Sequence, residues 1–305
     1  MDEVIEVGGL SRKFGDFTAL TDVTLSVGKG QIFGYLGPNG AGKTTTIRIL
    51  LGLLKPTGGQ VRVLGHDPVS NDYSFRVRLA ALLETPGIYS DLSVFDNLLL
   101  YSRINQLDDA EKRITELLHR MQLDRKTHEY AGRLSQGMRQ KLAIARMLLS
   151  RPEVLFFDEP TSGLDPMFQR EVREIIKECA SQGSTVFLSS HNLHEVQEMC
   201  SVVGFIKEGC CTVVSDLAGL FRTHGDKKME ISFSSEKDKQ ESVLFLRKLG
   251  YVNDVPNSSK VELLLRSASD AGAIRTTISR DGIGEVEIAK KSLTLEDIFY
   301  IMMGS

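Results

Sequence analysis

The chain has 305 residues, of which 41% are hydrophobic and 25% are charged, and its formal net charge at pH 7 is -3. This length suits one large domain plus a small one, and the ordinary composition excludes a largely disordered chain. The charge balance has no basic excess, so nucleic acid is not expected as a partner.

The opening of the chain predicts several strands. Residues 4–7 and 23–27 alternate between apolar and polar, which is typical of half-buried strands, and residues 31–36 form a buried strand. A further strand is expected at 60–64, ahead of a turn at 65–68. Together these segments indicate an N-terminal antiparallel β subdomain.

A glycine-rich segment lies between the strand at 31–36 and a helix expected at 44–51. It reads Gly37, Pro38, Asn39, Gly40, Ala41, Gly42, Lys43 and Thr44, and Thr45 follows it. Glycines let the backbone aim N–H groups at a phosphate, Lys43 supplies a positive charge, and the Thr44 hydroxyl suits Mg²⁺. A glycine-rich turn that matches by chance is the alternative. The flanking strand and helix favour a P-loop, which binds the phosphates of a nucleoside triphosphate.

The middle of the chain changes to helical spacing. Apolar residues form helical stripes over residues 93–123. A second helix is expected after Ser135, which stands where an N-cap should, and it ends before the Arg151–Pro152 pair. We therefore expect a helical insertion at about residues 85–150.

Two apolar runs follow the helical insertion. Residues 154–157 are all large and apolar, which is typical of a strand buried on both faces of a parallel sheet. Residues 185–188 repeat this pattern after a helix expected at 168–180, which gives a βαβ unit. The sequence thus predicts an α/β fold with a P-loop NTPase core, in which a parallel sheet is flanked by helices.

A pair of carboxylates, Asp158 and Glu159, comes directly after the first of these runs. Asp158 can complete the shell of a Mg²⁺ ion, and Glu159 can orient or deprotonate a water molecule. Acids that merely solubilise a strand end would explain one carboxylate, but not a pair after four large apolar residues. With the P-loop, this pair indicates hydrolysis of a nucleoside triphosphate.

The last third alternates between strands and helices. The strands are expected at 229–233, 261–265 and 285–288, and the helices at 238–249, 271–279 and 295–302. We expect an ATPase domain at 1–220 and a small α+β domain at 228–305, joined by a linker at 217–227. The small domain carries no visible chemistry.

The segment at 134–140 reads LSQGMRQ and contains Ser135, Gln136 and Gly137. It resembles the LSGGQ signature of the ATP-binding cassette (ABC) family. Ser135 and the N–H groups around Gly137 stand at a helix N-terminus and can bind a phosphate, although an ordinary capped helix would look similar. The resemblance implies that this phosphate belongs to the partner subunit, so that a dimer holds two ATP molecules between the P-loop and signature of opposite chains.

Three further positions match the family in order and spacing. Residues 162–165 resemble its D-loop, which implies that Asp165 lies near the nucleotide. His191 resembles its switch histidine, which contacts the γ-phosphate, and the other histidines are expected to be structural. Phe14 resembles its aromatic adenine platform, because stacking needs a flat ring, and Phe17 is the alternative.

One position departs from the family. Glu84 stands where the family usually has the glutamine of its Q-loop. This departure, the signature and the C-terminal extension together resemble the ATPase subunits of exporters for bacitracin resistance or lantibiotic immunity. Glu84 would offer Mg²⁺ an anionic ligand in place of a neutral carbonyl.

The resemblance covers residues 4–220 and extends weakly into the tail. It implies an ATP-hydrolysing subunit that uses ATP and Mg²⁺, acts as a homodimer or beside a second ATPase subunit, and powers export through separate membrane permeases. In the family a permease helix docks at the region matching 84–97. No apolar run approaches the ~20 residues that span a bilayer, so we expect a cytoplasmic chain held at the inner face of the membrane by the permease.

The sequence disfavours two other functions. A soluble cassette ATPase acting on ribosomes or DNA is disfavoured, because the sequence has no tandem cassette, long coiled coil or basic stripe. A nucleotide switch without turnover is disfavoured by the presence of Glu159. The four cysteines have no zinc-binding spacing and are expected to be free thiols without a role.

Overall fold

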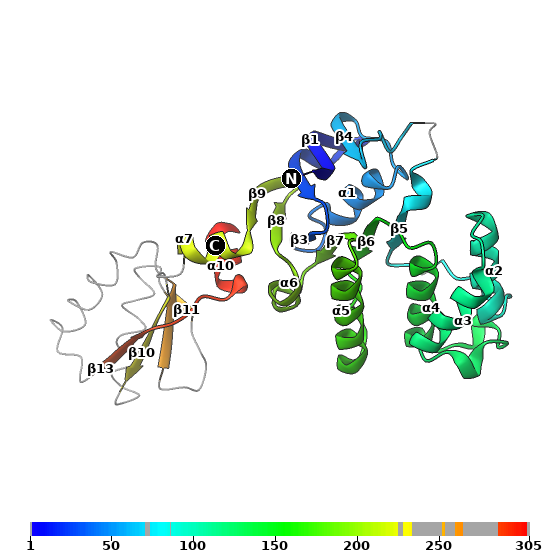
Figure 1. The fold of residues 1–305 in the computed structure, drawn as a ribbon. Coiled ribbons are helices and arrows are strands. Elements are labelled where there is room, and N and C mark those ends of the chain that lie inside the picture. The colour runs from blue at the N-terminus through cyan, green and yellow to red at the C-terminus, as the bar shows by residue number, and fades with distance from the viewer. Residues whose placement is uncertain are drawn as a thin grey trace. The chain divides into compact units, whose positions relative to one another are not determined.

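The computed structural model describes residues 2–70, 74–85, 87–224, 228–233, 252–253, 260–264 and 286–303. The chain divides into two compact units, Met1–Ser215 and Asp216–Ser305, and each is described by itself (Figure 1). Within these ranges, no helix combines the length and apolar character that a membrane span requires.

Unit 1 is built on one large sheet. Among the described residues its strands follow the order β4-β1-β2-β9-β8-β3-β7-β6-β5. Their bounds are β1 (Glu3–Phe14), β2 (Phe17–Gly28), β3 (Ile32–Leu36), β4 (Gly58–Val63), β5 (Leu79–Leu82), β6 (Val154–Asp158), β7 (Thr185–Ser190), β8 (Val202–Lys207) and β9 (Cys210–Asp216).

The central strands of this sheet are parallel. Strand β3 pairs with β7 and β8, and β6 pairs with β5 and β7, all in parallel. Every residue of β3, β6 and β7 is buried, as the apolar runs at 154–157 and 185–188 predict. Parallel strands end at the same edge, so the residues that follow β3, β6 and β7 are brought together there.

The antiparallel part begins with a long hairpin. Strand β1 pairs with β2 and with β4, and both β1 and β2 have 12 residues. The strands predicted at 4–7 and 23–27 are therefore real but too short. Irregular register along β1 disturbs the alternation of apolar and polar residues, which hides the rest of each strand from a pattern search.

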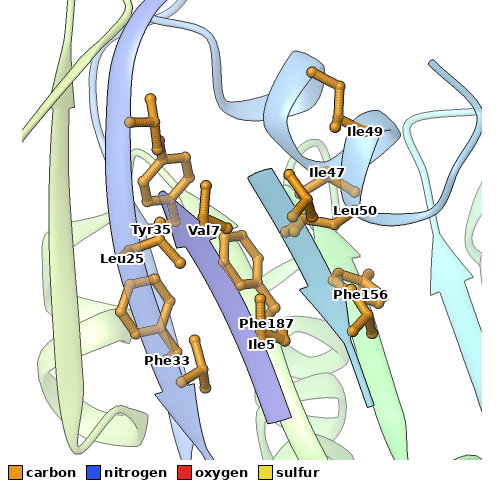
Figure 2. Close-up of a cluster of buried hydrophobic side chains, with 14 of the residues drawn as sticks. Ile5, Val7, Leu25, Phe33, Tyr35, Ile47, Ile49, Leu50, Phe156 and Phe187 are labelled. Carbon is orange, nitrogen blue, oxygen red and sulfur yellow. The ribbon is translucent and has the colours of Figure 1, made fainter. Parts of the chain in front are cut away.

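The core of unit 1 contains a cluster of aromatic rings between the strands (Figure 2). Phe187 lies at its centre, with ring centroids 5.2 Å from Phe33, 5.3 Å from Tyr35 and 5.9 Å from Phe156. Ile47 of the helix after the P-loop belongs to the same buried cluster. Burial of these rings fixes β3, β6 and β7 relative to the P-loop helix.

The helices of unit 1 are α1 (Lys43–Leu50), α2 (Val94–Ile104), α3 (Ala110–Arg120), α4 (Gln136–Leu148), α5 (Pro166–Ser181) and α6 (Leu193–Met199). In Figure 1, α2, α3 and α4 lie together as a helical subdomain, which agrees with the predicted insertion. Ser93 caps α2, because its hydroxyl accepts a hydrogen bond from the Asp96 amide at 3.0 Å. Helix α6 was not predicted.

Unit 2 contains a second sheet. Its elements are α7 (Leu217–His224), β10 (Lys228–Phe233), β11 (Val252–Asn253), β12 (Lys260–Leu264), β13 (Val286–Lys290) and α10 (Leu295–Met303). The described strands follow the order β11-β12-β10-β13. The helices predicted at 238–249 and 271–279 lie outside the described residues.

The segment predicted as a linker, 217–227, begins with a helix. Residues 217–224 form α7, in which Leu217 and Leu220 are buried. Their spacing of three residues places both on one helix face, and this signal was outweighed by the polar and turn-prone residues that follow.

Candidate functional site

The glycine-rich loop bends into α1 through Gly42. The φ of Gly42 is 110°, a value that residues with a Cβ rarely adopt, and Gly42 is the N-cap of α1. Lys43 follows it and is only 6% exposed. Its Nζ donates to the Gly37 carbonyl at 2.7 Å and the Pro38 carbonyl at 3.3 Å. The loop therefore wraps around the ammonium group of Lys43, as a phosphate cradle requires.

Asp158 ends strand β6 beside this loop and is only 4% exposed. It lies opposite Ser189 of β7, whose hydroxyl donates to Asp158 Oδ1 at 2.5 Å. The other oxygen, Oδ2, is buried and has no hydrogen-bond partner among the described residues. A buried carboxylate oxygen of this kind is costly to leave alone and suits a cation.

Glu159 links three loops. Its Oε1 lies 3.1 Å from Nζ of Lys43, and its Oε2 lies 2.7 Å from Nδ1 of His191. Its backbone amide donates to Ser189 at the end of β7. Its φ is 51°, which is unusual for a residue with a side chain and costs energy that the surrounding bonds must offset.

These groups line a cavity of about 920 Å³. The P-loop, the ends of β5 and β6, the segment after β6, the loop after β7 and the first turns of α4 all contribute. Its lining is Phe17, Asn39, Gly40, Gly42, Lys43, Thr44, Thr45, Leu83, Glu84, Gln136, Arg139, Gln140, Asp158, Glu159, Ser162, Gly163, Leu164 and His191. The cavity is large enough for a nucleotide and holds cationic groups for phosphates beside carboxylates for a metal and a water.

Ser135, Gln136 and Gly137 stand at the start of α4. The Ser135 hydroxyl accepts a hydrogen bond from the Met138 amide at 3.3 Å, so the predicted N-cap is confirmed. Ser135 and Gln136 are exposed, and Gln136 lines the cavity. At Gly137 a Cβ would have no atom within 4 Å. The N-terminus of α4 is therefore open to an anion.

Phe14 and Phe17 face each other across the β1–β2 hairpin. Phe14 is 45% exposed, and the Arg12 guanidinium lies over its ring at 4.4 Å from the centroid. Phe17 is 65% exposed and lines the cavity. The geometry thus brings the alternative, Phe17, to the cavity wall, while Phe14 lies beside it on the neighbouring strand.

Glu84 and Asp165 have different surroundings. Glu84 is exposed, follows β5 and lines the cavity, as a residue with access to a bound metal must. Asp165 caps α5, because its Oδ1 accepts hydrogen bonds from the amides of Met167 at 3.1 Å and Phe168 at 3.0 Å. This bond set gives Asp165 a structural task in addition to any contact with nucleotide.

Comparisons with known proteins agree with these motifs. The family model described as ABC transporter matches residues 20–162. The bacitracin transport ATP-binding protein BcrA of Bacillus licheniformis is 33% identical over 306 residues, which cover 100% of this chain and 98% of that protein. The chain belongs to the ABC transporter ATP-binding family. It is an ATP-hydrolysing subunit of a transporter.

Two more comparisons support this membership. The daunorubicin resistance ATP-binding protein DrrA3 of Streptomyces coeruleorubidus is 31% identical over 312 residues, which cover 99% of this chain and 96% of that protein. A solved ATP-binding subunit of an ABC transporter superposes with a TM-score of 0.68 at 30% identity, covering 72% of this chain and 92% of that one. The predicted fold and family are therefore confirmed, and the ribosome- or DNA-directed alternative is not favoured.

The site of this ABC ATPase fits Mg²⁺. The unpartnered Oδ2 of Asp158 and the hydroxyl of Thr44 are oxygen ligands of the kind that this ion prefers. Over the described part of the chain, no group of three or more His, Cys, Asp or Glu side chains is placed to hold a metal by itself. Mg²⁺ is commonly held by one or two protein oxygens together with the phosphates of a substrate, and Asp158 and Thr44 can supply such oxygens.

The sequence analysis missed Ser189, which orients Asp158. Ser189 and Ser190 are polar residues at the end of an apolar strand, and this is the signal that could have revealed them. Burial makes three of the cysteines less acidic, since it raises the pKa of Cys179 and Cys211 to about 11 and also raises the pKa of Cys200. Their thiols are protonated at neutral pH and are poor nucleophiles.

Proposed function

We propose that this ABC ATPase binds two MgATP molecules in a dimer, each between the P-loop of one copy and the signature of the other, and that closure and hydrolysis drive export through separate permeases. The observation that carries the proposal is Glu159, held between Lys43 and His191. This arrangement puts one carboxylate beside both the phosphate-binding loop and the switch histidine.

The phosphate side is assigned to the P-loop. Lys43 and the N–H groups of residues 37–45 bind the β- and γ-phosphates, and an arriving phosphate competes with Glu159 for the ammonium group. Thr44 and Asp158 would hold Mg²⁺, with Glu84 as a third oxygen. Bound there, the ion would supply positive charge against the charge that develops on the transferred phosphoryl group.

Glu159 is assigned to the attacking water. Once phosphate has drawn Lys43 away, its carboxylate is free to accept a proton, and His191 holds the opposite oxygen. His191 is 54% exposed, so its ring can also reach the γ-phosphate. Phe14 is assigned to the adenine ring, and Ser135, Gln136, Gly137 and Asp165 to the nucleotide of the partner copy.

Export is supported by relatives whose names describe bacitracin transport and daunorubicin resistance. The proposed permease contact is the segment 84–97. Asn97 is only 3% exposed. Its side-chain amide donates to the carbonyls of Tyr89 at 3.0 Å and Ser93 at 2.9 Å, and its Oδ1 accepts from the Tyr89 amide at 2.9 Å. These bonds fix the backbone of the segment. The Tyr89 ring is 58% exposed and is thus presented outward from a fixed backbone. A permease bound there holds the chain at the cytoplasmic face of the membrane.

The test uses Glu159→Gln. We expect this variant to bind MgATP normally, to hydrolyse it at least ~100-fold more slowly and to accumulate as an ATP-bound dimer in size-exclusion chromatography. Glu198→Gln, at an exposed position on α6, is the control and should match the wild type. Near-normal turnover of Glu159→Gln would remove Glu159 from its role.

Co-purification tests the export part separately. Purification of the tagged chain from its native membranes should return a polytopic membrane protein. Recovery of ribosomal RNA or DNA in its place would support the rival function.

A further inference from the structure

Glu195 is a buried carboxylate outside the residues assigned so far. It lies in the first turn of α6 and is only 3% exposed. Both of its oxygens are bound: Thr161 Oγ1 donates to Oε2 at 2.6 Å, and Arg173 Nη1 donates to Oε1 at 3.2 Å. A buried charge with two specific partners is costly to remove singly and holds those partners in place.

Helix α6 connects Glu195 to the loop that carries His191. The helix begins two residues after His191, and its N-cap Asn192 accepts a hydrogen bond from the Glu195 amide at 3.3 Å. It also packs very closely on β3, since a Cβ at Gly34 would lie 2.5 Å from Cγ1 of Val196. The first turn of α6 is therefore fixed against the sheet, and the loop carrying His191 is anchored at that end.

Thr161 belongs to the other side of the site. It lies two residues after Glu159 and is only 6% exposed. Its carbonyl accepts hydrogen bonds from the Leu164 amide at 3.3 Å and the Gln169 side chain at 3.2 Å. The Ser162 amide in turn donates to the carbonyl of Glu159 at 3.2 Å. Thr161 is thus the buried end of the turn that carries Glu159.

The loops after β6 and β7 are consequently joined by two side-chain bonds. The outer bond is Glu159–His191 beside the cavity, and the inner bond is Thr161–Glu195 in the buried layer beneath. The outer bond joins the two residues that take part in the proposed chemistry, whereas the inner bond has no part in that chemistry. Glu159 has a φ of 51°, and a residue keeps such a strained backbone conformation only when the surrounding contacts hold it there.

We propose that Glu195, acting through Thr161, is a positioning residue that holds Glu159 opposite His191 during ATP hydrolysis. This inference rests on the proposed role of Glu159. Arg173 balances the buried charge of Glu195, since its Nη1 lies 3.2 Å from Oε1 of Glu195. Glu195 thus preorganises the general base, Glu159, and it does so without touching the substrate.

The primary variant is Thr161→Val, which removes the hydroxyl at nearly constant volume and leaves the Glu195–Arg173 pair intact. We expect kcat for ATP to fall by about 10-fold while KM and the Kd for ATP stay within about twofold, since only the transition state uses the positioned base. Thr161→Ser retains the hydroxyl and should stay within about threefold of the wild-type kcat.

Glu198→Gln is the matched control. It removes a carboxylate from the same helix and the same arginine, but it does not touch the turn that carries Glu159. It should leave kcat unchanged. Thr161→Ala, which also removes the hydroxyl and leaves the Glu195–Arg173 pair intact, is the second variant, should Thr161→Val fail to give a cooperative thermal transition, and it should also lower kcat at unchanged Kd.

The decisive measurement repeats Thr161→Val in the Glu159→Gln background. If Thr161 acts only by positioning Glu159, Thr161→Val should not lower the residual turnover of the Glu159→Gln variant any further. A further loss of about 10-fold, a parallel change in kcat and Kd, or a Thr161→Ser variant as slow as Thr161→Val would overturn the inference. Normal turnover of Glu159→Gln would refute the proposed function itself, whereas slow Glu159→Gln with normal Thr161→Val would refute only this inference.

Discussion

The two halves of the nucleotide site differ in how firmly they are held. In the core half, Lys43 is buried and is bonded to the carbonyls of its own loop and to Glu159, and Asp158 is buried and is bonded to Ser189 of the neighbouring strand. In the signature half, Ser135 and Gln136 are exposed at the start of α4, where the only bond of the Ser135 side chain among the described residues is its cap of the helix. We infer that the core half binds nucleotide by itself, whereas the signature half needs a dimer to act.

This difference follows from the architecture. The core half lies at the edge of the sheet where the parallel strands β3, β6 and β7 end. Residues at the end of one strand can therefore bond to residues at the end of its neighbour. The helical subdomain that carries the signature is attached to α5 by ion pairs such as Lys141–Glu171 at 3.0 Å and Arg120–Glu178. Such partly exposed pairs are worth ~1 kcal/mol or less each, so they hold the helical subdomain to α5 only weakly.

The largest effect is expected in the core half, from Lys43→Ala. Loss of the buried ammonium group removes the main cation facing the phosphates, and we expect ATP affinity to fall by ~100-fold or more. Isothermal titration calorimetry of the isolated chain measures this directly. The exposed Lys112→Ala is the control, and unchanged affinity in Lys43→Ala would mean that the core half does not bind the phosphates.

A different result is expected in the signature half, from Ser135→Arg. The bulky cation should block closure of the dimer and reduce hydrolysis by ~50-fold or more, because the composite site cannot assemble. ATP binding to the single chain should stay within about threefold, since the P-loop is untouched. If calorimetry gives the same loss of binding for Ser135→Arg as for Lys43→Ala, the two halves are not separable.

A smaller effect is expected at Phe14, the proposed adenine platform, which lies at the edge of the core half. We expect Phe14→Ala to weaken ATP binding by roughly 1–3 kcal/mol and Phe14→Tyr to be nearly neutral, as stacking on a flat ring requires. The Arg12 guanidinium holds the Phe14 ring in place before nucleotide arrives. Phe17→Ala is the control, and a larger loss there would assign the platform to Phe17.

The smallest effect is expected at Glu84, which lies between the two halves. Glu84→Gln should keep ATPase activity within a few-fold, because a neutral oxygen can replace the carboxylate, whereas Glu84→Ala should need several-fold more Mg²⁺ for half-maximal turnover. Titration of turnover against Mg²⁺ separates them. Superimposable curves for the wild type and both variants would show that Glu84 does not touch the metal.

The sequence predicted the parts of this site that depend on local chain geometry. The P-loop bend at Gly42 and the cap at Ser135 each use neighbouring residues, so a short motif is sufficient to reveal them. It could not predict the bonds Ser189–Asp158 and Thr161–Glu195, because these depend on the register of β7 against β6 and on how α6 packs. The same limit hid α6 itself, since seven residues give little periodicity.

The most direct test of the central claim mixes two inactive variants, Lys43→Ala and Ser135→Arg. In a mixed dimer, the intact P-loop of the Ser135→Arg chain faces the intact signature of the Lys43→Ala chain, and so one complete site forms. With half of the dimers mixed and one of two sites intact in each, our account predicts recovery to about a quarter of wild-type ATPase activity. Gln136 lines the cavity of its own chain, so the alternative to a signature that acts on the partner's nucleotide is one that acts on the nucleotide of its own chain. A mixture that stays as inactive as its components would contradict the account.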